Sequence, residues 1–364
     1  MRIEKVDKLK GIAIVLVVLG HAIQHTTEDF LQTSYIAKLI YCFHMPLFMW
    51  LSGYVARIKG ERVVDGLRWI GKQFISLVLP IIVWEYILAG YFHRIHSVEA
   101  VINILHAWIL NPTGGYWFLW TLFLCDVLFL ILFTISRGFN RKWRGGTELT
   151  FAGIEVITVF ALSHAFAISW GNIGNLYLYY FFFCLGHFIG RRNQATGGVF
   201  AEDELSVISD RIMAAVSGHR TLVSVLLALC YFGGAVIYTG GQDINIRGSV
   251  LLSIVLSLIY RFVIASIGIV FLWMITDYIK GFLGRTLTFV GRYTKEIYIL
   301  QGMMISFLGR IIRRMYWGKW ENIIVITVLS LAGSLVIPLA IERGVIELLF
   351  FGKRKVSILT SSKN

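Results

Sequence analysis

Apolar runs of about 20 residues recur along the whole chain, and each is long enough to cross a lipid bilayer as a helix. Of the 364 residues, 57% are hydrophobic and only 15% are charged, whereas roughly a quarter of a soluble domain is charged. This pattern predicts an all-α polytopic membrane helical bundle of about ten transmembrane helices, built as a single domain over residues 1–364. The expected helices span residues 8–27, 36–57, 72–93, 115–136, 150–168, 174–191, 219–239, 249–278, 294–314 and 322–350.

Lys and Arg residues gather in alternate segments between these runs, and such segments face the cytoplasm. Both the N and the C terminus are therefore expected to be cytoplasmic, together with the polar linker 191–220. The loop between Arg310 and Lys319 breaks the rule, which indicates either a function for its positive charge or misplaced last spans. Because the net charge of +13 is spread between spans, it excludes nucleic acid as a partner and favours the lipid bilayer.

The helix expected at 8–27 carries ionisable side chains at membrane depth. At about 100° per residue, eleven residues make close to three turns, so Lys10 and His21 share one face, about 16 Å apart. Asp7 lies within roughly 40° of that face, and His25 follows one turn after His21. A charged residue at the bilayer centre costs about 3 kcal/mol unless it is paired or lines a cavity. The histidine is either satisfied by a neighbouring helix or functional, and the aligned stripe favours function.

The second expected helix places His44 at about the depth of His21. Pro46 is expected to loosen the helix beside it and free a carbonyl. Two imidazoles without a carboxylate are a weak zinc site, so no metal is predicted. The four cysteines lie in apolar runs without a CxxC pair, which indicates buried thiols rather than disulfides; they are Cys42, Cys125, Cys184 and Cys230.

Further polar residues also fall in or near the spans. Arg261 lies near the middle of its span and cannot lose its charge, so it needs a carboxylate or an anionic ligand. Glu85 and Asp126 are its candidate protein partners at that depth. Glu296 is expected near the cytoplasmic interface, where it can snorkel or pair with a cation. Trp117 suits either an interfacial aromatic belt or a platform that stacks on a sugar.

Several of these stretches resemble motifs of the acyltransferase 3 family. DKLKGIAIVLVVLGH, at 7–21, is similar to a family signature in which ten residues separate a basic residue from a histidine, here Lys10 and His21. FHMPLFMWLSGYVAR, at 43–57, resembles the second-helix motif of the family. Softer later motifs resemble WFL at 117–119, YYFFFCLGHFIGRR at 179–192 and GRYTKEIYIL at 291–300. The pattern looks most like the subgroup of fucose 4-O-acetylases.

The chain departs from the family pattern at two places. The family often has an Arg-x-x-Arg pair before the proline of the third helix, whereas only Arg68 and Lys72 are basic just before Pro80. A histidine often follows the last motif, where this chain has Gln301, and this puts a second-histidine role in doubt.

The resemblance implies a bacterial inner-membrane enzyme that moves an acyl group, commonly acetyl, from acyl-CoA to a hydroxyl. The usual acceptors are cell-surface sugars, glycolipids or polysaccharide precursors. The family's catalytic histidine maps onto His21 and its basic partner onto Lys10, and Asp7 lies close to their face. The phosphates of CoA need a basic cytoplasmic rim, for which the candidates are Arg57, Arg62, Arg68 and Lys72, with Arg261 deeper in the membrane. The candidate acceptor-binding residues are His44, Trp117 and Glu85.

This chemistry suits the residues, because a neutral imidazole is an effective base for an alcohol. Two other classes stay open. A proton-coupled transporter or exporter of a polysaccharide intermediate or small carboxylate would also use intramembrane His, Arg and Glu, although the sequence has no inverted repeat. A structural or sensory membrane protein would use the same residues for packing. The acceptor, the acyl group, direct transfer as against an acyl-enzyme, and a homo-oligomeric state are open as well.

Overall fold

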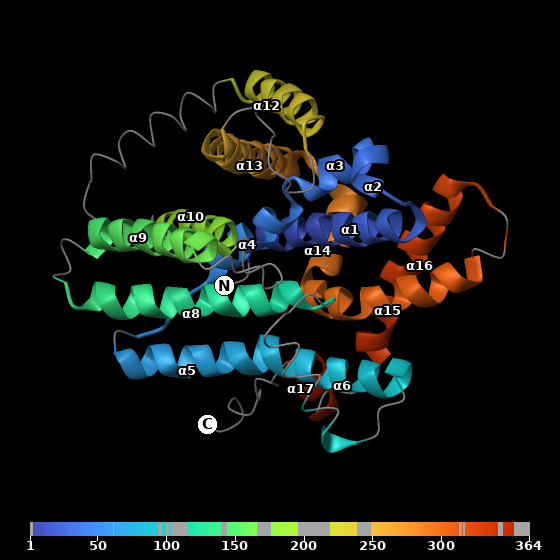
Figure 1. Ribbon diagram of the computed structural model, residues 1–364, viewed down its shortest axis with the longest axis horizontal. Helices are drawn as coiled ribbons and strands as arrows, with labels where there is room; N and C mark the ends of the chain where they lie inside the picture. Colours follow the sequence, from blue (N-terminus) through green and yellow to red (C-terminus); the bar gives the residue numbers. More distant parts are fainter. Residues whose placement is uncertain are drawn as a thin grey trace, which may run out of the picture. The chain divides into compact units, whose positions relative to one another are not determined.

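The computed structural model describes residues 3–60, 62–93, 97–99, 102, 115–139, 144–165, 176–195, 219–238, 249–312, 315, 317–340 and 345–352. This part of the chain is helical and contains no strand (Figure 1). Its elements are α1 (Glu4–Thr26), α2 (Phe30–Thr33), α3 (Tyr35–Tyr41), α4 (His44–Val55), α5 (Val63–Gln73), the π-helix η1 (Phe74–Val78), α6 (Leu79–His93), α8 (Trp117–Arg137), α9 (Arg144–Ala165), α10 (Leu176–Ala195), α12 (Arg220–Ala235), α13 (Val250–Ile275), the 3₁₀-helix η3 (Thr276–Tyr278), α14 (Gly281–Arg292), α15 (Thr294–Ile312), α16 (Lys319–Ala340) and α17 (Val345–Phe351).

Within the described ranges, five helical stretches are long and apolar enough to cross a membrane. They are Tyr35–Val55, Val63–Glu85, Trp117–Arg137, Leu252–Tyr278 and Lys319–Ala340. The all-helical prediction is confirmed, and the chain has the character of a multi-pass membrane protein. The predicted count of ten spans and the placement of both termini are not confirmed. Most of the predicted linker 191–220 lies outside the described residues.

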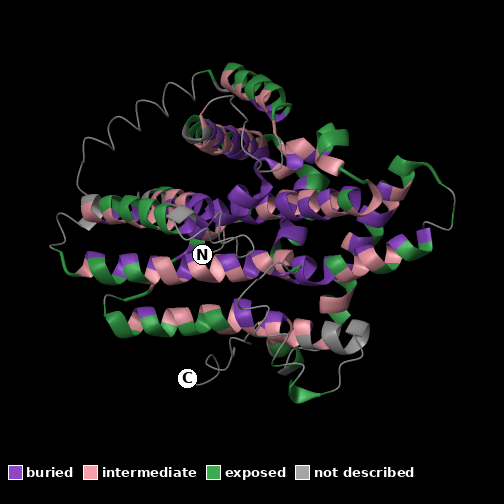
Figure 2. Ribbon diagram, in the orientation of Figure 1, coloured by how far each residue is buried: buried purple, intermediate pink, exposed green. Residues whose placement is uncertain are grey.

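Packing divides the chain into two units. The first contains Met1–Val55 and Leu185–Leu335, and the second contains Ala56–Cys184 and Val336–Asn364. In the first unit, α14 and α15 both pack against α1, whose residues are mostly buried or intermediate in Figure 2. By contrast, α12 carries a row of exposed apolar side chains, as expected of a surface that meets lipid; they include Leu222, Val225, Leu226 and Leu229.

Two glycines bring α1 and α14 into backbone contact. A Cβ atom built on Gly291 would lie 1.7 Å from the carbonyl oxygen of Asp7. A Cβ on Gly11 would lie 2.0 Å from the carbonyl oxygen of Leu287. No side chain fits either position, so these two glycines fix how closely the helices approach.

The first unit also anchors the N-terminal lysines. Lys8 Nζ donates to the carbonyl oxygen of Ile279 at 2.9 Å. Lys5 pairs with Asp277 at 2.7 Å and lies 4.2 Å from the ring centroid of Trp273. These cations, read in the sequence as topology signals, therefore also hold α1 against the turn between α13 and α14.

The entry into α4 bears on the prediction for Pro46. The chain turns at Cys42 and Phe43, and α4 begins at His44. Pro46 therefore lies in the first turn of a helix, where its missing N–H costs nothing. The helix predicted at 36–57 is therefore broken just before Pro46, as expected, because a proline cannot donate to the carbonyl four residues earlier, here that of Cys42.

The second unit is built around α5, η1, α6, α8 and α17. Pro80 follows the π-helix η1, and a π-turn accommodates a residue that cannot donate to the preceding turn. Trp84 Nε1 donates to the carbonyl oxygen of Phe350 at 3.0 Å, which ties α6 to α17. Because α5, η1 and α6 follow one another directly along the chain, the helix predicted at 72–93 begins earlier, at Val63.

Other predicted bounds need correction. The stretch 249–278 is one long helix that ends in a 3₁₀ turn. The stretch predicted at 322–350 contains two helices, α16 and α17. The sequence reading missed α14 entirely. Cys230 is exposed, contrary to the expectation of buried thiols, whereas Cys42, Cys125 and Cys184 are buried.

Candidate functional site

His21, in the C-terminal half of α1, is held by α15. His21 Nδ1 lies 2.8 Å from Nε2 of Gln301. Gln301 is only 2% exposed, whereas His21 is half-buried, so the Gln301 side of this hydrogen bond is shielded from solvent. The helices α1 and α15 lie side by side (Figure 1). The imidazole of His21 is therefore fixed on the face of α1 that α15 covers.

The contact between His21 and Gln301 has two hydrogen-bond assignments, which differ by a half-turn of the amide. With the amide nitrogen against Nδ1, the nitrogen donates, and the neutral ring carries its own proton on Nε2. With the amide oxygen in that place, Nδ1–H donates and the lone pair of Nε2 is free. Only the second assignment leaves a base at Nε2.

His44 provides a second imidazole in the same unit. It is 3% exposed, and its Nδ1 donates to the carbonyl oxygen of Ile40 at 2.7 Å, since a carbonyl can only accept. The Nε2 lone pair of His44 is thus left for another donor. The ring packs edge-on against Tyr41, with centroids 5.0 Å apart. His21 and His44 lie close enough to interact electrostatically, so the structure brings these two predicted residues together.

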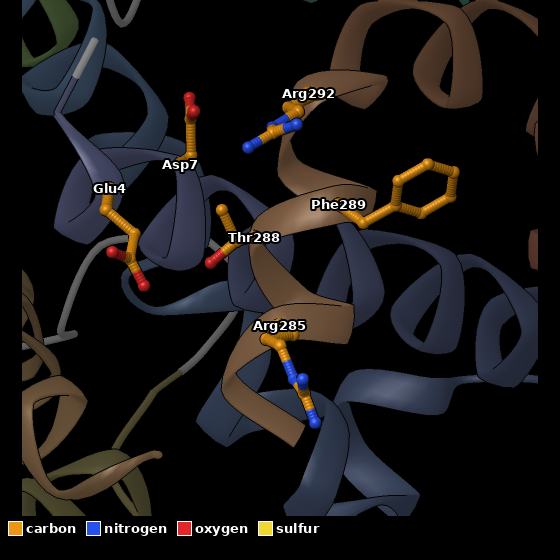
Figure 3. A pocket seen from close by; sticks show the side chains of 6 residues that line it. All are labelled: Glu4, Asp7, Arg285, Thr288, Phe289 and Arg292. Carbon is orange, nitrogen blue, oxygen red and sulfur yellow. The ribbon is translucent and has the colours of Figure 1, made fainter. Parts of the chain in front are cut away.

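Asp7 and Lys10 lie near the other end of α1. Asp7 is buried and Lys10 is half-buried. Asp7 lines a pocket between α1 and α14, together with side chains from both helices (Figure 3). Lys10 precedes His21 by eleven residues of unbroken helix, about 16 Å along the axis. Because α1 is unbroken, the helical backbone places Lys10 and His21 on one face. Both α14 and α15 pack along this helix.

The residues of the predicted basic rim belong to the second unit. Arg57, Arg62, Arg68 and Lys72 are all exposed. Arg62 Nε lies 3.6 Å from Asp65 Oδ2 at the start of α5. These cations are accessible, as a landing site for an anionic donor requires.

Arg261 and its proposed protein partners fall in different units. Arg261 is half-buried on α13 in the first unit, whereas Glu85 and Asp126 belong to the second. Asp126 is 1% exposed and accepts a hydrogen bond from Gln73 Nε2 at 2.9 Å. Asp126 therefore has a partner within its own unit that the sequence did not indicate.

Trp117 is the first residue of α8 and is half-buried. Its ring lies tilted against Tyr179, with centroids 5.8 Å apart. This geometry is compatible with both an aromatic belt and a stacking platform.

Two other predictions can be compared with the structure. Glu296 is 1% exposed at the start of α15, which argues against snorkelling, whereas its pairing with a cation stays a prediction. Among the side chains that the structure describes, no three His, Cys, Asp or Glu residues gather in a way that could hold a metal ion.

Sequence reasoning did not predict a site role for three residues that the structure places beside His21 or in the pocket. Gln301 stood out only as a departure from the family's histidine, and its role as the partner of His21 depends on how α15 packs. Arg285 and Arg292 lie on α14 in the wall of the pocket. The sequence feature that could have indicated them is their spacing of seven residues in an amphipathic stretch, which places both arginines on one helix face.

Comparison with known proteins adds independent information. A family model described as an acyltransferase domain matches residues 3–343. The nodulation protein NolL of Mesorhizobium japonicum is 31% identical over 188 residues, which cover 50% of this chain and 46% of that protein. NolL of Sinorhizobium fredii is 35% identical over 143 residues, which cover 36% of this chain and 37% of that protein. The chain thus spans less than half the length of each of these relatives. No solved structure gives a significant match.

Proposed function

The chain belongs to the acyltransferase 3 family, and we propose that it is a membrane-bound O-acyltransferase. It moves an acyl group, acetyl in the simplest case, from acyl-CoA to a hydroxyl of a cell-surface sugar, glycolipid or polysaccharide precursor. The observation that carries the proposal is the part-buried contact of His21 with Gln301 on the α1 face that also bears Lys10.

His21 acts as the general base. Its Nε2 takes the proton of the acceptor hydroxyl as the oxygen attacks the thioester carbonyl carbon. The new C–O bond forms, the C–S bond breaks, and the thiolate of CoA leaves with the proton that the imidazole returns. The step needs the Nδ1–H tautomer, which goes with the second amide assignment, in which the oxygen of Gln301 faces Nδ1 and accepts its hydrogen bond.

Lys10 and Asp7 act at the donor end of the same helix. Lys10 binds the donor or stabilises charge that develops on it, because an ammonium attracts phosphate and oxyanion oxygens. Asp7 is the third residue of the proposed catalytic set and lies about one turn from Lys10.

The remaining predicted residues divide between donor and acceptor. Arg57, Arg68 and Lys72, with Arg62 beside them, form the exposed rim that attracts the CoA phosphates, and Arg261 contributes deeper in the membrane. His44, Trp117 and Glu85 serve the acceptor. The free Nε2 of His44 accepts a hydrogen bond from a sugar hydroxyl, and the indole of Trp117 packs against the C–H face of the ring.

The location follows from the donor and the acceptor together. The protein is a multi-pass protein of a bacterial inner membrane with both termini in the cytoplasm, where acyl-CoA is made. Within the bilayer, donor and acceptor reach His21 from opposite sides. This arrangement accounts for an ionisable ring inside an apolar helix.

The test uses inside-out membranes supplied with radiolabelled acetyl-CoA, followed by extraction of the lipid and glycan fractions. The wild-type protein should label a glycan or glycolipid, and His21→Ala should abolish the label at equal expression. His25→Ala is the matched control, since His25 lies one turn further along α1, and it should retain labelling.

Equal labelling by wild type and His21→Ala would remove His21 from the reaction. No labelling by any form, combined with gradient-driven flux of a sugar intermediate in sealed vesicles, would replace the enzyme with a transporter.

A further inference from the structure

A pocket of about 300 Å³ lies between the first turns of α1 and the length of α14. Glu4 and Asp7 line it from α1 (Figure 3). The lining residues from α14 follow the helical spacing i, i+3, i+4 and i+7, so one face of the helix points toward the pocket; they are Arg285, Thr288, Phe289 and Arg292.

We infer that this pocket binds the nucleotide end of the acyl-CoA donor. The inference rests on the proposed function and gives it a second, separate donor subsite. It differs from the predicted basic rim, because the pocket lies in the same unit as His21, whereas the rim belongs to the other unit.

The chemistry of the lining residues matches a nucleotide better than a simple anion. Arg285 and Arg292 offer two planar guanidinium groups, the preferred protein partners of phosphate oxygens. The carboxylates of Glu4 and Asp7 would repel a free phosphate but accept hydrogen bonds from the amino group of adenine and from ribose hydroxyls. The ring of Phe289, 41% exposed, provides apolar surface for a base. A ligand that carries phosphates, hydrogen-bond donors and an aromatic base uses all of these groups.

The position of the pocket fits the length of the donor. Asp7 precedes His21 by fourteen residues of one uninterrupted helix, about 21 Å, and Lys10 precedes it by about 16 Å. The arm of CoA between its pyrophosphate and its sulfur has about 13 bonds, on the order of 15 Å at the rise of an extended chain. With the nucleotide at the level of Asp7 and the pyrophosphate near Lys10, the thioester reaches the level of His21.

The pocket is also held firmly in shape. The backbone contacts at Gly11 and Gly291 fix α14 on α1, and Thr288 Oγ1 donates to the carbonyl oxygen of Gly284 at 2.8 Å. Little reorganisation is therefore needed when a ligand enters, which favours binding.

The first experiment measures the Kd of acetyl-CoA and of adenosine 3′,5′-bisphosphate for the full chain in nanodiscs of zwitterionic lipid. Arg285→Gln and Arg292→Gln should each raise both Kd values about tenfold or more, as expected for loss of a charged phosphate contact. Arg310→Gln removes the same charge from an exposed position near the far end of α15 and should leave both values unchanged.

Failure of this inference and failure of the proposed function give different results. If the wild-type protein binds no CoA compound, the proposed donor is wrong and the inference falls with it. If it binds acetyl-CoA and all three variants bind equally well, the nucleotide lies elsewhere while the proposed function stands.

Two further measurements guard against a purely structural effect. Acetyl-pantetheine lacks the nucleotide, so its transfer rate should be the same in wild type and in both pocket variants; a parallel loss would overturn the inference. In Phe289→Cys, adenosine 3′,5′-bisphosphate should slow maleimide labelling of the new thiol at least fivefold, and unchanged labelling would also overturn it.

A phospholipid headgroup also carries a phosphate. Changing the lipid of the nanodiscs distinguishes a lipid ligand from a nucleotide. If the pocket binds the nucleotide, CoA should compete with anionic phosphatidylglycerol for it in nanodiscs that contain this lipid. The Kd of acetyl-CoA should still rise in Arg285→Gln and Arg292→Gln. The opposite result is that the anionic lipid stabilises the wild-type protein but neither variant, while the Kd of CoA is the same in all three proteins. In that case the pocket holds a lipid and the inference is wrong.

Discussion

Gln301 provides a sharp test of the proposed chemistry, because it touches His21 and no reacting group. Gln301→Met keeps the volume of the side chain, removes the hydrogen bond and leaves Nδ1 of His21 unsatisfied. The bond is 2.8 Å long and Gln301 is 2% exposed, so the loss of a buried partner costs about 1–3 kcal/mol. At about 1.4 kcal/mol per tenfold, this predicts a fall in kcat of about 5- to 150-fold.

The measurement is the steady-state kinetics of acetyl transfer, with kcat and the KM for acetyl-CoA determined separately. The expected loss lies in kcat, with KM unchanged, because Gln301 orients the base rather than binding the donor. Because Gln301→Met leaves a buried polar group without its partner, the free energy of unfolding should fall by about 1–3 kcal/mol, so kcat is expressed per folded protein, well below the unfolding midpoint. Gln301→Glu, which keeps an acceptor oxygen, should recover part of the activity.

A double-mutant cycle provides the control. In a His21→Ala background, Gln301→Met should cost no further activity, since Gln301 acts only through that ring. Wild-type kcat in Gln301→Met would refute the positioning role. A loss of kcat that merely tracks a loss of folded protein would refute it as well.

Three other outcomes are expected. Lys10→Ala should raise the KM for acetyl-CoA or lower kcat, and unchanged kinetics would remove Lys10 from the donor site. Gly291→Ala should lower the midpoint of thermal unfolding by several degrees, because its Cβ would lie 1.7 Å from a backbone oxygen and overpacking costs about 1–3 kcal/mol; Gly302→Ala, with no neighbouring atom within 4 Å, should be neutral or stabilising, and equal effects would contradict the role of the helix contact. Arg261→Gln and Glu85→Gln should show a coupling energy above about 0.5 kcal/mol in unfolding if they form an ion pair, whereas additive effects would leave Arg261 to the donor.

The helical nature of the chain and the stripe on α1 could be predicted because both depend on local periodicity. Lys10 and His21 share a face in any α-helix, whatever surrounds it. The sequence also indicated that a polar group at membrane depth needs a partner. It could not name Gln301 as that partner, because the match of α1 to α15 is set by packing across a sequence separation of 280 residues.

The missed helix α14 has a different explanation. Its twelve residues are amphipathic and lie between two longer apolar stretches, so a search for spans passes over it. Gly291 was read as part of a family motif, while its use as a contact point depends on the backbone of α1. Pro46 indicated a weak point in the helix predicted at 36–57, but periodicity alone does not show that the chain turns at Cys42 and Phe43.

The absence of any break in α1 has a consequence for sequence variation in this protein. From Glu4 to Thr26 the helix contains no proline. Each inserted residue therefore changes both the direction of the side chains that follow and their distance along the helix axis. One residue inserted between Lys10 and His21 would rotate the imidazole by about 100° and carry it away from Gln301. An insertion of seven would nearly restore the angle but lengthen the donor path by about 10 Å, beyond the reach of the thioester. The segment between these two residues should therefore accept changes of side chain far more readily than changes of length.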